Sequence, residues 1–121
     1  MSPEIHTYFA AQHNINNFSY KKILSKESSL KEDINNFFLN DGLGLNITIP
    51  FKLLACDICS KLDLTAKQCG SLNTLKKEGD EIVGYNTDGV GFIDDIKIKN
   101  INIINSNILV IGAGGQNLFI Q

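Results

Sequence analysis

Residues 44–52 constrain the fold of this chain more than any other stretch of its sequence. Apolar and polar side chains alternate there, which is the pattern of a β-strand with one buried face and one free face. The apolar positions are Leu45, Ile47 and Ile49, and the polar positions are Asn46 and Thr48. Pro50 then stops the strand and can begin a helix, because proline is tolerated in a first helical turn. The sequence therefore predicts that Lys52 lies just past the strand, beside the two polar side chains.

The rest of the chain alternates between helical and strand-like segments. We expect helices at residues 3–13, 30–38, 51–62 and 64–68, and another beyond Asp88. We expect strands at residues 18–24, 44–49, 71–75, 81–85 and 108–111, with a hairpin turn at residues 77–80. Strands that alternate with helices are typical of an α/β protein with a mostly parallel sheet flanked by helices, so the sequence predicts that fold class.

Charge and composition exclude several classes of partner. The 121 residues carry a formal net charge of -2 with a pI near 5.6, so we expect no nucleic-acid partner. No apolar run approaches the roughly 18 residues that a membrane span needs, and we expect neither a membrane partner nor a signal peptide. Cys56, Cys59 and Cys69 lack a second Cys pair or a His cluster, which favours buried thiols in a reducing cytoplasm over a metal or redox site.

Two interpretations are open for Lys52 and for Asp88. A single lysine is most often a solvated surface residue, but a lysine in a partly closed pocket can serve as a general acid or base. It then needs a partner that orients it, and Asp88 is the best candidate because it sits at a strand-to-helix turn. Asp88 can equally be the N-cap of the helix that follows, and the two roles are compatible.

Asn73 and Ser2 are also ambiguous from the sequence alone. Asn73 is either a turn residue or a hydrogen-bond donor to a hydroxylated ligand. Ser2 is an N-cap by default, yet the free amides and the dipole of a helix N-terminus also favour a carboxylate. His6 and His13 lack a matching Cys, Ser or acidic partner, so we interpret both as structural.

An apolar run at residues 108–111 leads directly into a glycine-rich segment, Gly112, Ala113, Gly114 and Gly115. A glycine-rich turn between a strand and a helix is the context of a dinucleotide-binding turn. The spacing is imperfect, because G-x-G-x-x-G needs a small residue at Asn117 and no residue that reads the ribose follows before Gln121. By itself the segment is a weak to moderate indication of nucleotide binding.

Four motifs, in this order, resemble the shikimate dehydrogenase family, which includes shikimate and quinate dehydrogenases. They are residues 46–52 (Asn-Ile-Thr-Ile-Pro-Phe-Lys), 70–74 (Gly-Ser-Leu-Asn-Thr), 84–92 (Gly-Tyr-Asn-Thr-Asp-Gly-Val-Gly-Phe) and 112–115 (Gly-Ala-Gly-Gly). Residues 2–6 are similar to the end of the family's S-x-S-P-x-x-H motif. The resemblance implies a substrate-binding domain at residues 1–88 and, at residues 89–121, a connecting helix, a linker and the start of a Rossmann NADP-binding domain.

The resemblance also implies a reaction, the NADPH-dependent reduction of 3-dehydroshikimate to shikimate on the chorismate route to the aromatic amino acids. Lys52 and Asp88 match the family's acid/base pair at the reacting oxygen. Residues that match the substrate pocket are Ser2, Asn46, Thr48, Asn73 and Asp88. Residues that match the turn for the phosphates of NADP are Gly112, Ala113, Gly114, Gly115 and Gln116.

The sequence departs from the family pattern at both ends. The family's first strand and the first serine of S-x-S have no counterpart, and the nucleotide domain is cut short at Gln121. We therefore expect a truncated form with an open sheet edge, which favours a homodimer or a complementing second chain. The alternative to an active dehydrogenase is a catalytically inactive remnant, or one half of a split protein, that keeps only the substrate-binding region.

Overall fold

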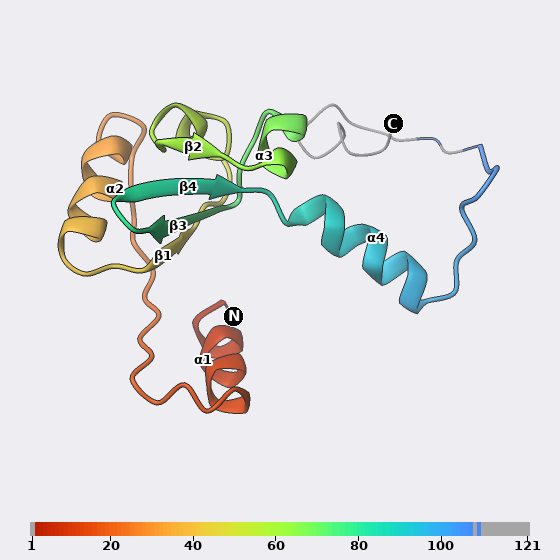
Figure 1. Cartoon of the computed structure of the whole chain (residues 1–121), viewed down its shortest axis with the longest axis horizontal. Coiled ribbons are helices and arrows are strands. Elements are labelled where there is room, and N and C mark those ends of the chain that lie inside the picture. The colour runs from red at the N-terminus through yellow and green to blue at the C-terminus, as the bar shows by residue number, and fades with distance from the viewer. Residues whose placement is uncertain (1, 108, 110–121) are drawn as a thin grey trace.

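The computed structural model of the chain describes residues 2–107 and residue 109. Its helices are α1 (Ser2–Gln12), α2 (Leu30–Leu39), α3 (Leu64–Cys69) and α4 (Asp88–Ile98), with a short 3-10 helix, η1 (Leu54–Asp57). Its strands are β1 (Gly44–Asn46), β2 (Lys61–Leu62), β3 (Thr74–Glu78) and β4 (Glu81–Tyr85). Helices and strands mix along the chain (Figure 1), which confirms the expected α/β class.

In the part of the chain that the structure describes, the strands form one sheet in the order β1-β3-β4-β2. β3 pairs antiparallel with β1 and with β4, and β2 runs parallel to its neighbour, β4. The prediction of a mostly parallel sheet was therefore wrong. The turn at Gly79 and Asp80 is one reason, because so tight a connection between β3 and β4 can only reverse the chain. Gly79 supplies the positive φ, 62°, that this turn needs.

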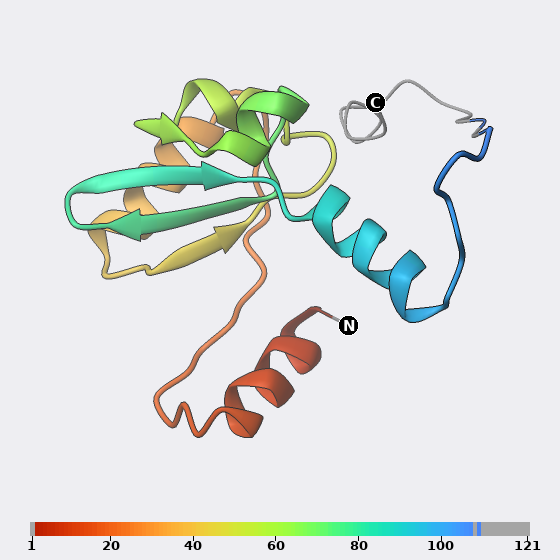
Figure 2. The same cartoon turned by 45° about the vertical axis from the view of Figure 1, so that its right-hand side comes forward.

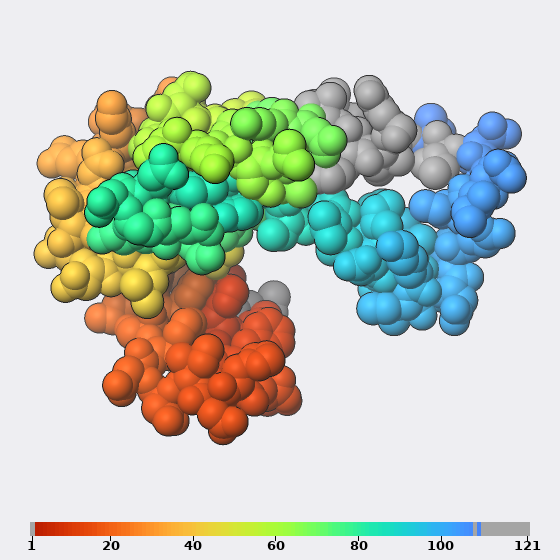
Figure 3. Space-filling view, viewed as in Figure 1, coloured from red at the N-terminus to blue at the C-terminus, as the bar shows by residue number. Residues whose placement is uncertain are grey.

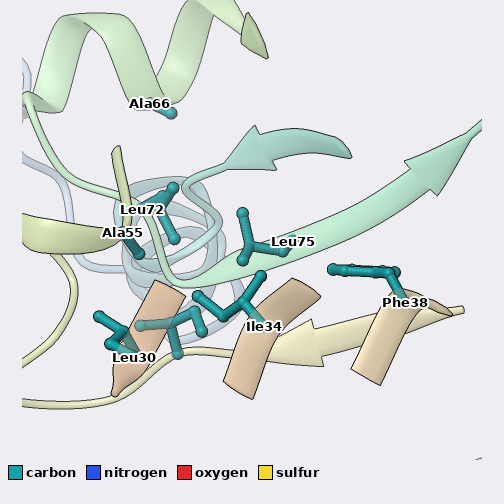
Figure 4. Packing of buried hydrophobic residues seen from close by; sticks show 8 residues of the cluster. Leu30, Ile34, Phe38, Ala55, Ala66, Leu72 and Leu75 are labelled. Carbon is teal, nitrogen blue, oxygen red and sulfur yellow. The ribbon is translucent and has the colours of Figure 1, made fainter. Parts of the chain in front are cut away.

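Helix α2 covers one face of the sheet and supplies much of the core. Leu30, Ile34 and Phe38 recur every four residues, so they lie on one side of the helix, where they are buried. Figure 4 shows these side chains close to Leu72 and Leu75, which are fully buried. Other buried members of the same cluster are Ile47, Ala55 and Ala66. The cluster thereby fixes the position of β1 and of the loop that follows it.

Two predicted elements were wrong. Residues 18–24 form no strand, although their side chains alternate, because no described strand pairs with them. Residues 51–62 do not form one helix but contain η1 and β2. The chain leaves the helical path because Ser60 N donates to Ile82 O at 2.8 Å, which brings β2 alongside β4.

The remaining described elements were predicted with shifted ends. α1, α2, α3 and α4 are present where helices were expected. The hairpin expected at residues 77–80 is present with a shorter turn, Gly79 and Asp80, because Lys77 and Glu78 still pair with β4. β1 ends at Asn46, earlier than predicted, because Phe51 N bonds to Thr48 O and turns the chain. The predicted strand and glycine-rich turn at residues 108–115 lie outside the described residues.

Helices α1 and α4 both project from the sheet. β4 leads directly into α4, and Figure 2 shows a coil that links α1 to α2 and passes β1. In Figure 3 the N-terminal residues form a separate lobe below the sheet. Ala10 is the one apolar side chain of residues 2–25 that is buried, whereas Leu24 is 97% exposed. The described residues 2–25 therefore add little to the core.

Candidate active site

Lys52 lies in the loop after β1, and hydrogen bonds of the backbone hold it there. Phe51 N donates to Thr48 O at 2.9 Å, which closes a turn just before Lys52. Lys52 O accepts a hydrogen bond from Leu72 N at 3.0 Å, so the loop is tied to a fully buried residue. The Lys52 side chain is only 18% exposed, and lysine is rarely buried to this degree unless it is paired. The interpretation of Lys52 as a solvated surface residue is therefore wrong.

Lys52 and Asp88 form an ion pair. Lys52 Nζ lies 2.5 Å from Asp88 Oδ2, and the Asp88 side chain is 30% exposed. Asp88 is the first residue of α4, where the helix dipole and the free amides stabilise a negative charge. Thr87 occupies the N-cap position, so the N-cap alternative for Asp88 is wrong. The predicted contact between Lys52 and Asp88 is confirmed, while their chemical roles stay a prediction.

Asn73 fixes the direction of the Asp88 carboxylate. Asn73 Nδ2 donates to Asp88 Oδ1 at 2.9 Å and to Thr87 Oγ1 at 2.8 Å. Its Oδ1 accepts hydrogen bonds from Thr74 Oγ1 at 2.9 Å and from Thr87 N at 3.2 Å. Asn73 is thus a hydrogen-bond donor to the carboxylate. Because Asn73 engages one carboxylate oxygen, the other oxygen is turned toward Lys52.

A buried asparagine that was not singled out in the sequence, Asn86, holds the start of α4. Its side chain is 1% exposed, and Nδ2 donates to Ser71 O at 2.9 Å and to Ser71 Oγ at 3.1 Å. Its Oδ1 accepts a hydrogen bond from Asp88 N at 3.1 Å. The turn from β4 into α4 is therefore fixed to the segment before β3. The available signal was the Asn-Thr-Asp-Gly sequence at residues 86–89, since an asparagine in a turn often bonds to the backbone two residues on.

Ser2, Asn46 and Thr48 lie along an open hollow of about 750 Å³. Residues 19–25 form one wall of this hollow and residues 44–51 the other. Lys52, Asn73 and Asp88 are not among the residues that line it. The structure thus divides the predicted site residues into two groups, an ion pair oriented by Asn73 and a set of polar side chains along the hollow.

A chain of hydrogen bonds connects the two groups. Asn46 Nδ2 donates to Thr74 Oγ1 at 3.5 Å, and Thr74 Oγ1 donates in turn to Asn73 Oδ1. On its other side, Asn46 Oδ1 accepts a hydrogen bond from Tyr20 OH at 2.9 Å. The Tyr20 ring stacks on His6, with ring centroids 4.3 Å apart. Burial raises the pKa of Tyr20 above its usual 10.0, so its hydroxyl keeps the proton that this bond uses.

Thiol and metal chemistry find no support in the described part of the chain. Cys56, Cys59 and Cys69 are free, and burial raises the pKa of each thiol, which lowers the thiolate fraction. Residues 2–107 and 109 contain no group of three or more His, Cys, Asp or Glu side chains placed to hold a metal ion. Among these residues there is also no helix long and apolar enough to cross a membrane.

An ammonium group held by an oriented carboxylate is suited to proton transfer to or from an oxygen atom. Lys52 has this arrangement, in a setting largely shielded from water. The residues predicted to hold the phosphates of a dinucleotide are Gly112, Ala113, Gly114, Gly115 and Gln116, and they lie outside the described residues. Their role stays a prediction.

Known proteins resemble this chain in sequence. The family model of the shikimate dehydrogenase substrate binding domain matches residues 1–75. The chain is 41% identical over 116 residues to the shikimate dehydrogenase (NADP(+)) of Janthinobacterium sp. (strain Marseille). It is 45% identical over 115 residues to that of Buchnera aphidicola subsp. Acyrthosiphon pisum (strain Tuc7). Each match covers 94% of this chain and 42% of the relative, so the chain spans less than half the length of these curated relatives.

A solved structure resembles the fold over nearly the whole chain. It is the shikimate 5-dehydrogenase from Thermus thermophilus in complex with NADP(H) and shikimate, with a TM-score of 0.88 and 25% sequence identity. The match covers 98% of this chain and 44% of that protein.

Proposed function

Because the chain belongs to the shikimate dehydrogenase family, we propose that it carries the substrate-binding part of an NADP-dependent shikimate dehydrogenase. The proposed reaction is the reduction of 3-dehydroshikimate to shikimate, on the chorismate route to the aromatic amino acids. The observation that carries the proposal is the ion pair of Lys52 and Asp88, oriented by Asn73. The division into a substrate-binding part up to residue 88 and a nucleotide-binding part beyond it belongs to the same proposal.

Lys52 supplies the proton in this proposal. NADPH, when bound, supplies the hydride that adds to the carbonyl carbon of the substrate. As the C=O double bond becomes a single bond, Lys52 Nζ donates a proton to the oxygen, so negative charge does not accumulate there. Asp88 Oδ2 holds the ammonium group in position before the transfer. In the reverse reaction the neutral amine takes the proton back.

Polar side chains along the hollow hold the substrate. Asn46 and Thr48 line the hollow, and we assign to them hydrogen bonds with substrate hydroxyl groups. Ser2 stands at the start of α1, where free backbone amides attract an anion, and we assign to it the substrate carboxylate. Asn73 uses its side-chain donors on Asp88 and Thr87, so its main role is to orient the acid/base pair. The Thermus relative, whose structure holds shikimate and NADP(H), supports this assignment of ligands.

NADP is the proposed cofactor, and the cytoplasm is the proposed location. Both curated relatives are named as NADP(+) enzymes. Gly112, Ala113, Gly114, Gly115 and Gln116 form the proposed turn around the phosphates. Free thiols are expected in a reducing compartment. Cys56 and Cys59 form no disulfide bond, and Cys59 Sγ instead donates a hydrogen bond to Cys56 O at 3.4 Å.

Lys52→Met tests the proposed proton donor. Methionine keeps a long apolar stem but carries no transferable proton. In steady-state oxidation of NADPH with 3-dehydroshikimate, we expect kcat to fall by about 100-fold or more, which is the usual contribution of general acid catalysis. Binding of shikimate, measured by calorimetry, should persist. The matched control is Lys77→Met, because Lys77 is an exposed lysine in the β3–β4 hairpin.

Two outcomes would overturn parts of this proposal. Unchanged turnover in Lys52→Met would assign the proton to another group. Binding of shikimate without turnover in the unsubstituted chain would mean that the chain is a substrate-binding remnant and not an active dehydrogenase.

A further inference from the structure

The side chains of Asn46 and Thr74 meet across two strands of the sheet. Thr74 opens β3 and pairs with Asn46, the last residue of β1. Directly opposite residues of an antiparallel pair place their side chains on the same face, with Cβ atoms about 5 Å apart. Asn46 Nδ2 donates to Thr74 Oγ1 at 3.5 Å, and Asn46 itself lines the hollow. Thr74 therefore connects the hollow to Asn73, the residue that precedes it.

The partners of Asn73 fix the direction of each hydrogen bond around its side chain. Thr87 N carries a proton and can only donate, so the atom of Asn73 that faces it at 3.2 Å is Oδ1. Nδ2 of Asn73 then faces Asp88 Oδ1 at 2.9 Å. Because Oδ1 of Asn73 has no proton, Thr74 Oγ1 must donate to it, at 2.9 Å. A reversed Asn73 amide would lose these bonds and turn its oxygen toward the carboxylate.

Thr74 is the donor that ties the Asn73 side chain to the sheet. Its Oγ1 lies 2.9 Å from Asn73 Oδ1, against 3.2 Å for Thr87 N. Thr87 is adjacent to Asp88 at the start of α4, whereas Thr74 pairs with β1 on one side and with β4 on the other. The other described hydrogen bonds of the Asn73 side chain go to Thr87 and Asp88. Without the Thr74 hydroxyl, the amide would be oriented by the same turn whose carboxylate it orients.

The direction of donation continues from Thr74 to Tyr20. A hydroxyl has one proton, and Thr74 gives it to Asn73, so Asn46 Nδ2 is the donor toward Thr74. Asn46 Oδ1 then accepts from Tyr20 OH. The hydrogen bonds from Tyr20 to Asp88 thus all donate in the same direction, and the last one ends on a carboxylate. Hydrogen bonds in such a row polarise one another, so each strengthens the next.

We propose that Thr74 is a positioning residue for the acid/base pair. Its hydroxyl donates to Asn73 Oδ1, keeps the amide nitrogen against Asp88, and links that amide to Asn46 at the wall of the hollow. Asp88 in turn holds the ammonium group of Lys52, so Thr74 acts on the proton donor through two other side chains. The consequence for turnover rests on the proposed function, whereas the effect on the ion pair does not.

Thr74→Val tests this role, because valine keeps the branched shape of threonine but has no hydroxyl. The measured quantity is the rate at which the Lys52 ammonium protons exchange with water, followed by NMR in the 121-residue chain without substrate or cofactor. The Lys52 signal is the one that is missing from Lys52→Met. A carboxylate that holds the ammonium group slows this exchange. Exchange in Thr74→Val should therefore be about three- to tenfold faster, the effect of one lost hydrogen bond.

Two further variants separate this role from a general disturbance of the protein. Thr74→Ser keeps the hydroxyl and should restore the slow exchange. Thr7→Val is the matched control, because Thr7 is exposed and its hydroxyl donates within α1, to Pro3 O at 2.8 Å. Exchange of the Lys52 ammonium protons should not change in that variant.

A double-mutant cycle tests whether Thr74 acts through Asn73. Asn73→Ala should itself speed exchange at Lys52, and Thr74→Val should then add nothing. Asn46→Ala should speed exchange by about twofold in the unsubstituted chain, since its bond to Thr74 is long at 3.5 Å, and not at all in Thr74→Val. In steady-state turnover, kcat of Thr74→Val should fall by about three- to tenfold, while KM for 3-dehydroshikimate stays within about twofold.

Three outcomes would overturn the positioning role. They are unchanged exchange at Lys52 in Thr74→Val, equally fast exchange in Thr74→Ser, and an undiminished effect of Thr74→Val in the Asn73→Ala background. Faster exchange in Thr74→Val, restored in Thr74→Ser, would support the positioning role even if the unsubstituted chain shows no turnover, a result that would reject only the proposed function. Unchanged exchange together with normal turnover would reject the positioning role alone.

Discussion

Residues 44–88 and residues 2–25 both contribute polar side chains to the candidate site, yet different forces hold them in place. In residues 44–88, hydrogen bonds join Asp88 to the side chains of Asn73 and Asn86. The segments that carry these residues also pack against the buried core. In the described residues 2–25, the apolar side chains are mostly exposed, and Tyr20 OH makes the hydrogen bond that reaches β1.

The proposed proton transfer and the proposed binding of the substrate carboxylate therefore depend on different parts of the chain. The proton-transfer pair lies in the part of the chain that shares a buried core with α2. Ser2, to which we assign the substrate carboxylate, belongs to a segment with few buried contacts, and such segments open at low free-energy cost. A bound substrate would therefore order residues 2–25 far more than residues 44–88.

The largest expected effect is that of Leu75→Ala. Leu75 is 0% exposed between α2 and the sheet, and loss of a buried leucine side chain costs transfer energy and leaves a cavity. We expect the free energy of unfolding to fall by about 3 kcal/mol, measured by equilibrium unfolding in urea. Leu24→Ala is the matched control, because Leu24 is 97% exposed and its loss should cost less than about 0.5 kcal/mol. Similar losses for both variants would contradict the proposed division of the molecule.

Asn86→Ala should have the next largest effect. The substitution removes hydrogen bonds to Ser71 O, to Ser71 Oγ and from Asp88 N in a buried setting. We expect a loss of about 2 kcal/mol in the same urea experiment, since buried polar groups lose partners that water does not replace. The control is Asn17→Ala, at an exposed position of the N-terminal segment, which should change stability little. A loss below about 0.5 kcal/mol would mean that the turn into α4 is held by other contacts.

Asp63→Ala should have a smaller effect, through the N-cap of α3. Asp63 Oδ1 accepts a hydrogen bond from Ala66 N at 2.8 Å, which satisfies a free amide in the first turn of the helix. We expect a loss of about 1 kcal/mol, as is usual when such a cap is removed. Ser19→Ala, in the exposed segment, is the control in thermal unfolding. An unchanged melting temperature for Asp63→Ala would argue against the cap.

Much of the fold was predictable because local patterns and tertiary packing agree. The four-residue spacing of Leu30, Ile34 and Phe38 predicted α2, and the Gly79 turn predicted the β3–β4 hairpin. The direction of most strands was not predictable, because β1 pairs with a strand 28 residues away, as the contact of Asn46 with Thr74 illustrates. The alternation at residues 18–24 indicated a strand, but a strand needs a neighbour, and the described sheet offers none.

The candidate site was predictable to a similar degree. The pairing of Lys52 with Asp88 was predicted, because one follows a strand and the other stands at a strand-to-helix turn, and the structure places the two together. The hydrogen bond from Asn73 to Asp88 was not predicted, since Asn73 was expected in a turn or at a ligand. Tyr20 was not predicted, since nothing local in the sequence shows that its hydroxyl meets Asn46, 26 residues further on. Contacts of this kind depend on how separate elements pack, which a single sequence does not state.

Tyr20→Phe is expected to have the smallest effect and acts at the junction of the two regions. It removes the hydroxyl that donates to Asn46 Oδ1 but keeps the ring that stacks on His6. Because this bond is exposed, we expect a loss of only about 0.5 kcal/mol in the free energy of unfolding near neutral pH. Amide exchange in α1 should become faster, while exchange in β3 and β4 stays the same. Tyr8→Phe is the matched control, since Tyr8 OH bonds within α1, to Gln12 Nε2.

The stabilising contribution of the Tyr20 hydroxyl depends on pH. Burial raises the pKa of Tyr20 in the folded chain above 10.0, so its stabilising contribution is fully present below pH 10.0 and is lost as pH rises through the folded value. The difference in stability between the unsubstituted chain and Tyr20→Phe should therefore vanish at high pH, when the phenol has lost the proton that Asn46 accepts. A difference that stays constant through this range would show that the contribution of the Tyr20 hydroxyl does not depend on the proton that it donates to Asn46.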